Sequence, residues 1–381
     1  MSVDELLAGK RICVCAGSGG VGKTTASAAI ALGMAAAGAK VAVVTIDPAQ
    51  RLANALGVEE LPNEPHRISP ARLAAAGLEI EGELWAMMLD PKRTFDDLID
   101  RLAPDRGRAE EIKANRVYRE LSTAVSGSQE FTAVAKLYDL DQEHQFDLLV
   151  LDTPPSRNAL DFLEAPQRLS SFFEGRGLNA LVRPTGLGIR VLGRSATPVL
   201  AALRRVTGVD LLADLGTFFQ LLGDMNRDLN RRALQVEELL RADTTAFVLV
   251  TSAEREPIDE AIWFHRTLEH GGLPFAGVIV NRMHHDLLNG NEPENVGPAL
   301  RRSLGADLAA RVAQNFDDYH VLARRDDLNV ERLAQALGDE PLIVVPQLDE
   351  DVHDLEGLLR MRRYLFASAA ERERLLADLV A

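Results

Sequence analysis

The amino-acid sequence predicts an α/β fold, with a doubly wound, mostly parallel sheet and an inserted helical subdomain. Short apolar runs that suit strands covered on both faces recur along the 381 residues. A glycine-rich turn joins the first of these runs to a helix, as in a parallel β-loop-α-β unit. Two longer stretches have helical periodicity and contain no convincing strand.

The strands are expected where apolar residues form continuous runs. Residues 11–16 form the first strand, residues 23–37 the helix after the glycine-rich turn, and residues 40–46 the second strand. Similar runs predict five more strands, at 84–89, 146–151, 246–251, 275–280 and 341–345.

The two helical stretches define the expected domain organisation. Residues 92–140 and 162–240 are predicted to form the helical subdomain, and residues 8–91, 141–161 and 241–381 the α/β core.

Composition limits the class of protein. A formal net charge of −15, from 42 basic and 57 acidic residues, argues against a general nucleic-acid binder. The two cysteines, Cys13 and Cys15, lie in the first strand and are too few for a four-cysteine zinc site. The N-terminus lacks the order of a signal peptide, and no apolar run of about 18 residues occurs. A cytoplasmic protein with reduced cysteines is therefore expected.

Residues 17–24, Gly-Ser-Gly-Gly-Val-Gly-Lys-Thr, match the phosphate-binding pattern G-x-x-x-x-G-K-[ST] between a predicted strand and a helix. Glycines let backbone N–H groups converge on phosphate oxygens, and the helix N-terminus adds its dipole. Lys23 is expected to reach the β- and γ-phosphates, and the Thr24 hydroxyl to bind Mg²⁺. The sequence thus predicts a P-loop NTPase core. The nucleotide-binding residues predicted on this segment are Gly19, Gly20, Val21, Gly22, Lys23, Thr24 and Thr25.

Two carboxylates are expected beside this loop. Asp152 ends the apolar run 146–151, where an acid organises Mg²⁺ directly or through water. Asp47 ends the second strand, where a carboxylate can orient and polarise water for attack on the γ-phosphate. The alternatives are an acid that merely ends a strand for Asp152 and a turn-forming Asp-Pro pair for Asp47.

Further segments, in order along the chain, resemble the ArsA/Get ATPases. This family comprises arsenite-pump ATPases and ATPases that target tail-anchored membrane proteins, and belongs to the deviant-Walker-A (ParA/MinD-like) group. Besides the phosphate loop, the resemblance lies in residues 47–52 (switch I), 85–91, 152–156 (switch II), 280–282 and 345–350.

The resemblance implies ATP and Mg²⁺ as cofactors and assigns roles at the matching positions. Asp47 would be the water-activating acid, and Thr24 and Asp152 would organise Mg²⁺. Asn281 would hydrogen-bond adenine, which a carboxamide can do as both donor and acceptor. The loop that packs on the base would include Pro346, Gln347 and Leu348.

The sequence departs from the family pattern at informative positions. Ser18 replaces a lysine that, in the family, crosses a dimer interface to the partner's nucleotide. Gln50 replaces the switch I histidine, and Arg157-Asn158 replace a Gly-His pair in switch II. Either a homodimer or a heterodimer with a paralogue that retains the lysine is consistent with this pattern. Arg157 is a candidate replacement charge, with a surface salt bridge as its alternative.

The cysteine positions also exclude two properties of the resembled family. Both cysteines belong to the first strand, so the family's Cys-x-x-Cys zinc clasp is missing. Arsenite prefers thiolate ligands, and none remains outside that strand. Neither a zinc site nor an arsenite site is therefore expected.

The helical region contains a basic stretch followed by an apolar one. Residues 175–209 contain six arginines and no acid, and residues 211–222 are strongly apolar. In the resembled family this region captures an apolar client helix, and arginines can also meet anionic lipid headgroups. The alternative is a self-packed helical subdomain with its arginines in solvent.

These expectations define a Mg-ATP-hydrolysing dimeric ATPase that acts as a nucleotide-driven switch for binding or targeting hydrophobic or membrane-protein segments. It would be cytoplasmic, with a peripheral position at the membrane as an option. One alternative is a hydrolysis-poor regulatory subunit of a heterodimer with a lysine-containing paralogue, which Ser18 favours. A further alternative is a ParA/MinD-like positioning ATPase, which the long helical insertion disfavours.

Overall fold

The computed structural model describes residues 1–47, 49–119, 128–153, 217–218, 220–223, 225–286, 301–302 and 304–378. The chain divides into two compact units: unit 1 comprises Met1–Leu89, Leu140–Ala159 and Leu240–Ala381, and unit 2 comprises Asp90–Asp139 and Leu160–Leu239. The basic stretch 175–209 and the Arg157-Asn158 pair lie outside the described residues. The role of the helical subdomain in binding a client therefore stays a prediction.

Unit 1 is built on one eight-stranded sheet with the order β3-β4-β2-β5-β1-β6-β7-β8. Every neighbouring pair is parallel except β3 and β4, so the predicted α/β fold with a mostly parallel sheet is confirmed. The strands are β1 (Ile12–Ala16), β2 (Lys40–Thr45), β3 (His66–Arg67), β4 (Glu83–Met88), β5 (Leu148–Asp152), β6 (Thr245–Ser252), β7 (Phe275–Met283) and β8 (Leu342–Pro346).

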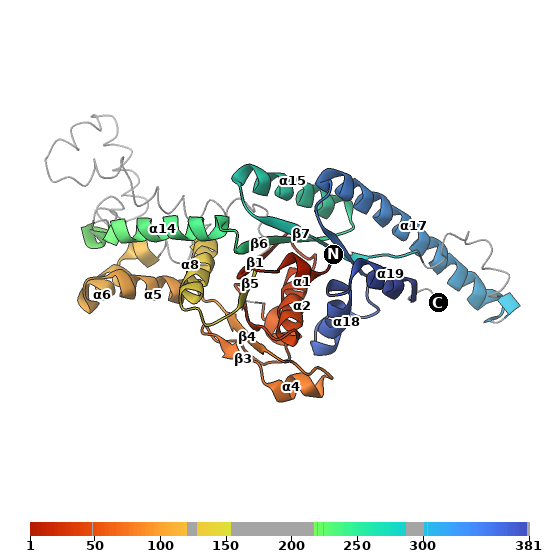
Figure 1. The fold of residues 1–381 in the computed structure, drawn as a ribbon, viewed down its shortest axis with the longest axis horizontal. Helices are drawn as coiled ribbons and strands as arrows, with labels where there is room; N and C mark the ends of the chain where they lie inside the picture. Colours follow the sequence, from red (N-terminus) through yellow and green to blue (C-terminus); the bar gives the residue numbers. More distant parts are fainter. Residues whose placement is uncertain are drawn as a thin grey trace, which may run out of the picture. The chain divides into compact units, whose positions relative to one another are not determined.

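Helices cover both faces of the sheet, which explains why its strands, apart from the edge strand β3, are mainly apolar. All residues of β1, β5 and β6 are buried. Helices α2 (Lys23–Ala36) and α18 (Leu355–Leu365) pack on one face, and α15 (Arg255–Gly271) and α17 (Ala306–Leu337) pack on the other (Figure 1). The shorter helices of this unit are α1 (Val3–Leu6), α3 (Arg51–Ala55), α4 (Pro70–Ala75) and α19 (Ala369–Asp378).

The position of β1 in the sheet determines which segments meet the phosphate loop. β5 and then β2 lie on one side of β1, and β6, β7 and β8 lie on the other side. In a parallel sheet the carboxyl ends of the strands share one edge, where ligands bind. The residues after β2 and β5 therefore flank the loop on one side, and those at the ends of β7 and β8 flank it on the other.

Unit 2 is helical and has its own apolar core. Its helices are α5 (Pro91–Leu102), α6 (Arg106–Ala114) and most of α8 (Ser128–Gln142) and α14 (Met225–Arg241). Phe218 and Leu222, which belong to the apolar segment 211–222, are only 2% and 1% exposed and pack into this core. These two residues are thus self-packed. No helix in the described ranges is long and apolar enough to cross a membrane.

Candidate nucleotide site

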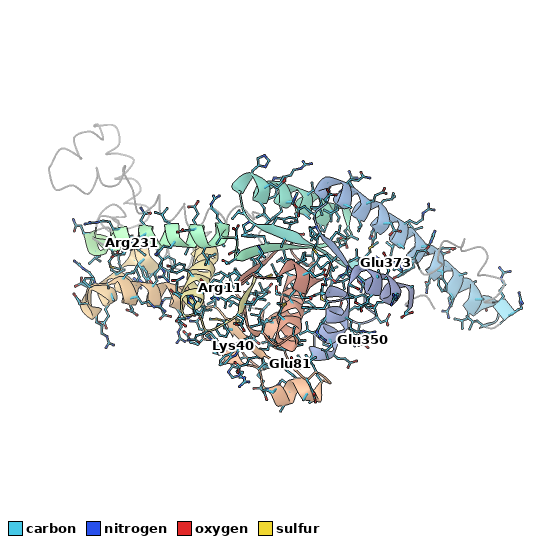
Figure 2. All side chains as sticks on the ribbon, in the orientation of Figure 1. Arg11, Lys40, Glu81, Arg231, Glu350 and Glu373 are labelled. Carbon is cyan, nitrogen blue, oxygen red and sulfur yellow. The ribbon has the colours of Figure 1, made fainter. Side chains whose placement is uncertain are left out.

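A cavity of about 450 Å³ opens at the carboxyl edge of the sheet in unit 1. Glu350, labelled in Figure 2, belongs to the segment after β8 that forms part of its wall. Most of the predicted site residues line this cavity: Gly20, Gly22, Lys23, Thr24, Thr25, Asp47, Asn281, Pro346, Gln347 and Leu348. Of the remaining predicted residues, which are not among those that line the cavity, Gly19 is exposed, and Val21 and Asp152 are buried.

Lys23 is the first residue of α2, and its side chain turns back onto the loop. Its Nζ donates a hydrogen bond to the Ser18 carbonyl oxygen at 2.6 Å, and the residue is 6% exposed. Burial lowers the pKa of Lys23, an effect that the nearby Asp152 carboxylate opposes. The ammonium is thus held at the loop by a backbone oxygen, which a phosphate oxygen can replace.

Asp152, at the end of β5, is 1% exposed and accepts two hydrogen bonds on the same oxygen. The hydroxyls of Thr24 and Thr45 each donate to its Oδ2 at 2.8 Å. Its Oδ1 is buried and has no hydrogen-bond partner among the described atoms. Burial raises the pKa of Asp152 to about 6, although both hydrogen bonds and Lys23 lower it. A divalent cation fits this environment because it supplies the missing partner and the missing positive charge.

Thr45 is a site residue that the sequence analysis missed. Its hydroxyl donates to Asp152 and accepts from the backbone N–H of Asp47 at 3.2 Å, and the residue is 1% exposed. One hydroxyl therefore joins the two candidate acidic residues. Its position, as the last residue of β2 and two residues before Asp47, was the available signal, but a threonine in a strand is also an ordinary β-former.

Asp47 lies between the sheet and α3, and both of its carboxylate oxygens have partners. Oδ1 accepts from the Ala49 N–H at 2.9 Å, and Oδ2 lies 3.4 Å from Nη1 of Arg51. The bond to Ala49 is typical of a turn-forming aspartate. The same side chain lines the cavity, so the geometry is compatible with both interpretations that the sequence left open.

The end of β7 contacts the phosphate loop from the other side. Nδ2 of Asn281 donates to the Val21 carbonyl at 2.9 Å, and a Cβ at Gly22, whose φ is +94°, would lie 2.3 Å from that nitrogen. Arg282, with φ of +58°, donates to the Gly20 carbonyl at 3.3 Å and lies 3.7 Å from Asp351. Gly22 thus allows β7 to approach the loop closely.

The segment after β8 is hydrogen-bonded to the end of β7. The backbone N–H of Gln347 donates to the carbonyl of Met283, at the end of β7, at 2.8 Å. Pro346, Gln347 and Leu348 therefore form the wall of the cavity opposite Asp47 and Asp152, on the far side of the loop.

These features define the class of the protein. A loop with the phosphate-binding pattern connects the central strand to a helix, and Lys23 and Thr24 begin that helix. A buried acid at the end of the adjacent strand bonds the threonine. This is the arrangement of a P-loop nucleotide-binding protein.

Comparison with known proteins identifies the family. The model of the family described as "Anion-transporting ATPase" matches residues 10–325, and the chain belongs to this family. We therefore classify it as a nucleotide-dependent ATPase of the ArsA/Get type.

Individual relatives agree with this assignment. The chain is 24% identical to "ATPase GET3" of Malassezia globosa over 92% of its own length and 89% of that protein. It is 30% identical to "ATPase ASNA1 homolog 1" of Paramecium tetraurelia, but this match spans only 44% of the chain and 45% of the relative. It is 32% identical to a "Putative arsenical pump-driving ATPase" of Halobacterium salinarum over 45% of the chain and 26% of the relative.

Proposed function

We propose that this chain hydrolyses Mg-ATP in the cavity at the carboxyl edge of the sheet. The observation that carries the proposal is the buried Asp152 carboxylate, which bonds Thr24 through one oxygen and has no partner on the other among the described atoms. A buried charge of this kind needs a cation. Thr24 and Asp152 would hold Mg²⁺, which when bound neutralises charge on the phosphates.

The chain's own residues would bind and orient the triphosphate. Lys23 would exchange its bond to the Ser18 carbonyl for phosphate oxygens, and the loop N–H groups and the N-terminus of α2 would bind the same oxygens. Asp47 would accept a proton from the attacking water. Asp47 lines the cavity, and its backbone N–H is linked through the Thr45 hydroxyl to Asp152, which supports a shared role.

The base would lie on the side of the cavity formed by β7 and β8. Asn281 uses one N–H on the loop, which leaves its Oδ1 and its second N–H for the edge of adenine. Pro346, Gln347 and Leu348 would pack on the face of the base. This assignment supports a preference for ATP.

For the molecule as a whole we propose a dimeric, nucleotide-driven switch that binds or targets hydrophobic or membrane-protein segments. The proposal is supported by membership of the ArsA/Get family and by the basic and apolar composition of residues 175–222. A cytoplasmic location, with contacts at the membrane surface, belongs to this proposal. So does the expected absence of zinc and arsenite sites.

The test of the hydrolysis proposal separates binding from turnover. Asp47→Asn keeps the size of the side chain and its bond to Ala49, but it removes the proton acceptor. ATP affinity, measured by calorimetry, should stay within about threefold of wild type, and turnover should fall about 10²-fold or more. Unchanged turnover would make Asp47 a turn-forming residue only.

A second function is favoured by Ser18. A serine side chain is uncharged, so this position of the loop presents no positive charge to a neighbouring subunit. Its Oγ is buried and has no partner among the described atoms. The chain would then be a hydrolysis-poor subunit that binds ATP and assembles with a lysine-containing paralogue. Turnover of the purified chain, with and without a co-purifying partner, separates the two functions, because brisk hydrolysis by the chain alone excludes the second.

A further inference from the structure

Positive charge is distributed unequally over the wall of the cavity. Besides Lys23, two arginines line its described part, Arg51 and Arg282. Arg282 lies on the side of β7 and is engaged by Gly20 and Asp351. Arg51 begins α3, directly after the segment that carries Asp47, on the side of β2 and β5.

The two sides of the cavity would meet different ends of a nucleotide. Asp152 and Thr24, the candidate Mg²⁺ ligands, lie at β5 and at the start of α2, and Asp47 follows β2. The phosphates that bind the cation must therefore lie on the side of β5 and β2. Arg51 is on that side and Arg282 is on the other, so Arg51 is the arginine placed near the terminal phosphate.

The present environment of Arg51 leaves its guanidinium free to move. Its side chain is 63% exposed, and the contact that the structure shows is with Asp47, at 3.4 Å between Nη1 and Oδ2. An exposed ion pair of this kind contributes little free energy, so a phosphate can displace it. Burial is the main cause of the lowered pKa of Lys23, and the charge of Arg51 lowers it further. The two cationic side chains are therefore close enough to interact electrostatically.

We propose that Arg51 is a catalytic residue that contacts the terminal phosphate of bound ATP and stabilises the charge on the transferring phosphoryl group. The inference rests on the proposed function of this cavity as an ATP site. In the step, the water oxygen forms a bond to the γ-phosphorus and its proton goes to Asp47. The bond from the γ-phosphorus to the β–γ bridging oxygen breaks, and its electron pair leaves with ADP.

The exchange of partners by Arg51 has a second effect on the same step. In the resting site the guanidinium is paired with the Asp47 carboxylate. When Arg51 turns to the phosphate, the ion pair opens and Oδ2 of that carboxylate becomes available to the attacking water. Because an arginine supplied in cis needs no partner chain, this arrangement allows hydrolysis within one subunit despite Ser18.

The test compares Arg51→Ala and Arg51→Lys with Arg67→Ala in the full chain. Arg67 is also exposed and ion-paired, with Glu83 at 3.0 Å, but it lies outside the cavity wall and serves as the matched control. Single-turnover hydrolysis of ATP should fall about 10²-fold or more in Arg51→Ala. Arg51→Lys should recover only part of this loss, because an ammonium lacks the planar pair of donors.

A binding measurement separates a catalytic role from general binding or misfolding. Calorimetry with Mg²⁺ and ADP alone should give wild-type affinity for Arg51→Ala, within about threefold. With ADP and aluminium fluoride, which imitates the transferring phosphoryl group, the variant should lose affinity by a factor comparable to its loss of rate. Equal losses for both ligands, or hydrolysis within about threefold of wild type, would overturn the inference.

The two proposals fail in different ways. If wild type shows no hydrolysis and no ADP binding that Lys23→Ala removes, the proposed function of the cavity is wrong. If both depend on Lys23 but neither hydrolysis nor aluminium fluoride binding depends on Arg51, only the role of Arg51 is wrong.

Discussion

At the scale of single residues, the hydroxyl of Thr45 links the two candidate acids. It donates to Asp152 Oδ2 and accepts from the N–H of Asp47, and nothing in a strand-forming pattern distinguishes it from an ordinary threonine. The consequence is that the carboxylate proposed to organise Mg²⁺ and the backbone that carries the proposed base are positioned by one side chain.

Thr45→Val keeps the shape of the side chain and removes both hydrogen bonds. We expect turnover to fall about tenfold, because each lost bond is worth about 1 kcal/mol and leaves Asp152 and Asp47 less well oriented. The affinity for ATP should change little. Steady-state turnover over a Mg²⁺ titration measures the effect, and Thr45→Ser is the matched control that should restore it. Wild-type turnover in Thr45→Val, or an equal loss of turnover in Thr45→Val and Thr45→Ser, would contradict this role.

The buried carboxylate of Asp152 should make the nucleotide-free protein less stable above about pH 6. Burial raises its pKa to about 6 from an unfolded value of about 3.9, so the folded state binds its proton more tightly than the unfolded state. The stability contributed by this group therefore falls as the pH rises from about 4 to about 6. Above about pH 6 the loss of folding stability caused by the Asp152 carboxylate stays constant.

Asp152→Asn should consequently stabilise the nucleotide-free protein at pH 8, by about 1–2 kcal/mol after the cost of a poorly bonded amide is subtracted. Urea unfolding of both proteins at pH 8 and at pH 4.5 measures the difference. The gain should shrink at pH 4.5, where wild type carries the proton on Asp152. A variant that is less stable than wild type at pH 8 would show that the carboxylate is favourably held without a cation.

At the scale of elements, α2 depends on close contact with the segment after α18. A Cβ added at Gly33 would lie 2.1 Å from Cε2 of Phe366, which leaves no room for a methyl group. In the sequence Gly33 is only an unusual residue within an alanine-rich helix. Its function as a contact point depends on the fold, so no local pattern could predict it.

Gly33→Ala tests this contact. Alanine is the better helix former by about 1 kcal/mol, but overpacking should cost more and give a net destabilisation of about 1–2 kcal/mol. Thermal unfolding measures the change, and Gly33→Ala combined with Phe366→Leu should recover most of it relative to Phe366→Leu alone. A rise in the unfolding temperature of Gly33→Ala would show that α2 and Phe366 are not in close contact.

The elements of the sheet could be predicted because their cause is local. Seven of the strands are continuous apolar runs, since helices cover both faces of the sheet. β3 was missed because it is two exposed residues, His66–Arg67, that pair antiparallel with β4 at the edge of the sheet. Such a pairing is imposed by the neighbouring strand and leaves no periodic signal in the sequence.

At the scale of the whole molecule, the sequence predicts those parts of the candidate site that belong to recognisable motifs. The phosphate-loop pattern and the acid at a strand end predict that Lys23, Thr24 and Asp152 lie beside one another, and in the structure these three side chains are neighbours. The bond of Asn281 to the loop, the link through Thr45 and the position of Arg51 depend on which strands are neighbours in the sheet. That order is not visible in the sequence of any one segment.

The central claim is that this cavity binds and hydrolyses Mg-ATP through Lys23. The most direct test is ATP turnover and ATP affinity of wild type and Lys23→Ala, with Lys92→Ala, an exposed lysine paired with Asp96, as the control. We predict that Lys23→Ala loses at least about 10²-fold in turnover per bound ATP, or loses ATP binding altogether, while Lys92→Ala behaves as wild type. Tight ATP binding with normal turnover in Lys23→Ala would contradict the account.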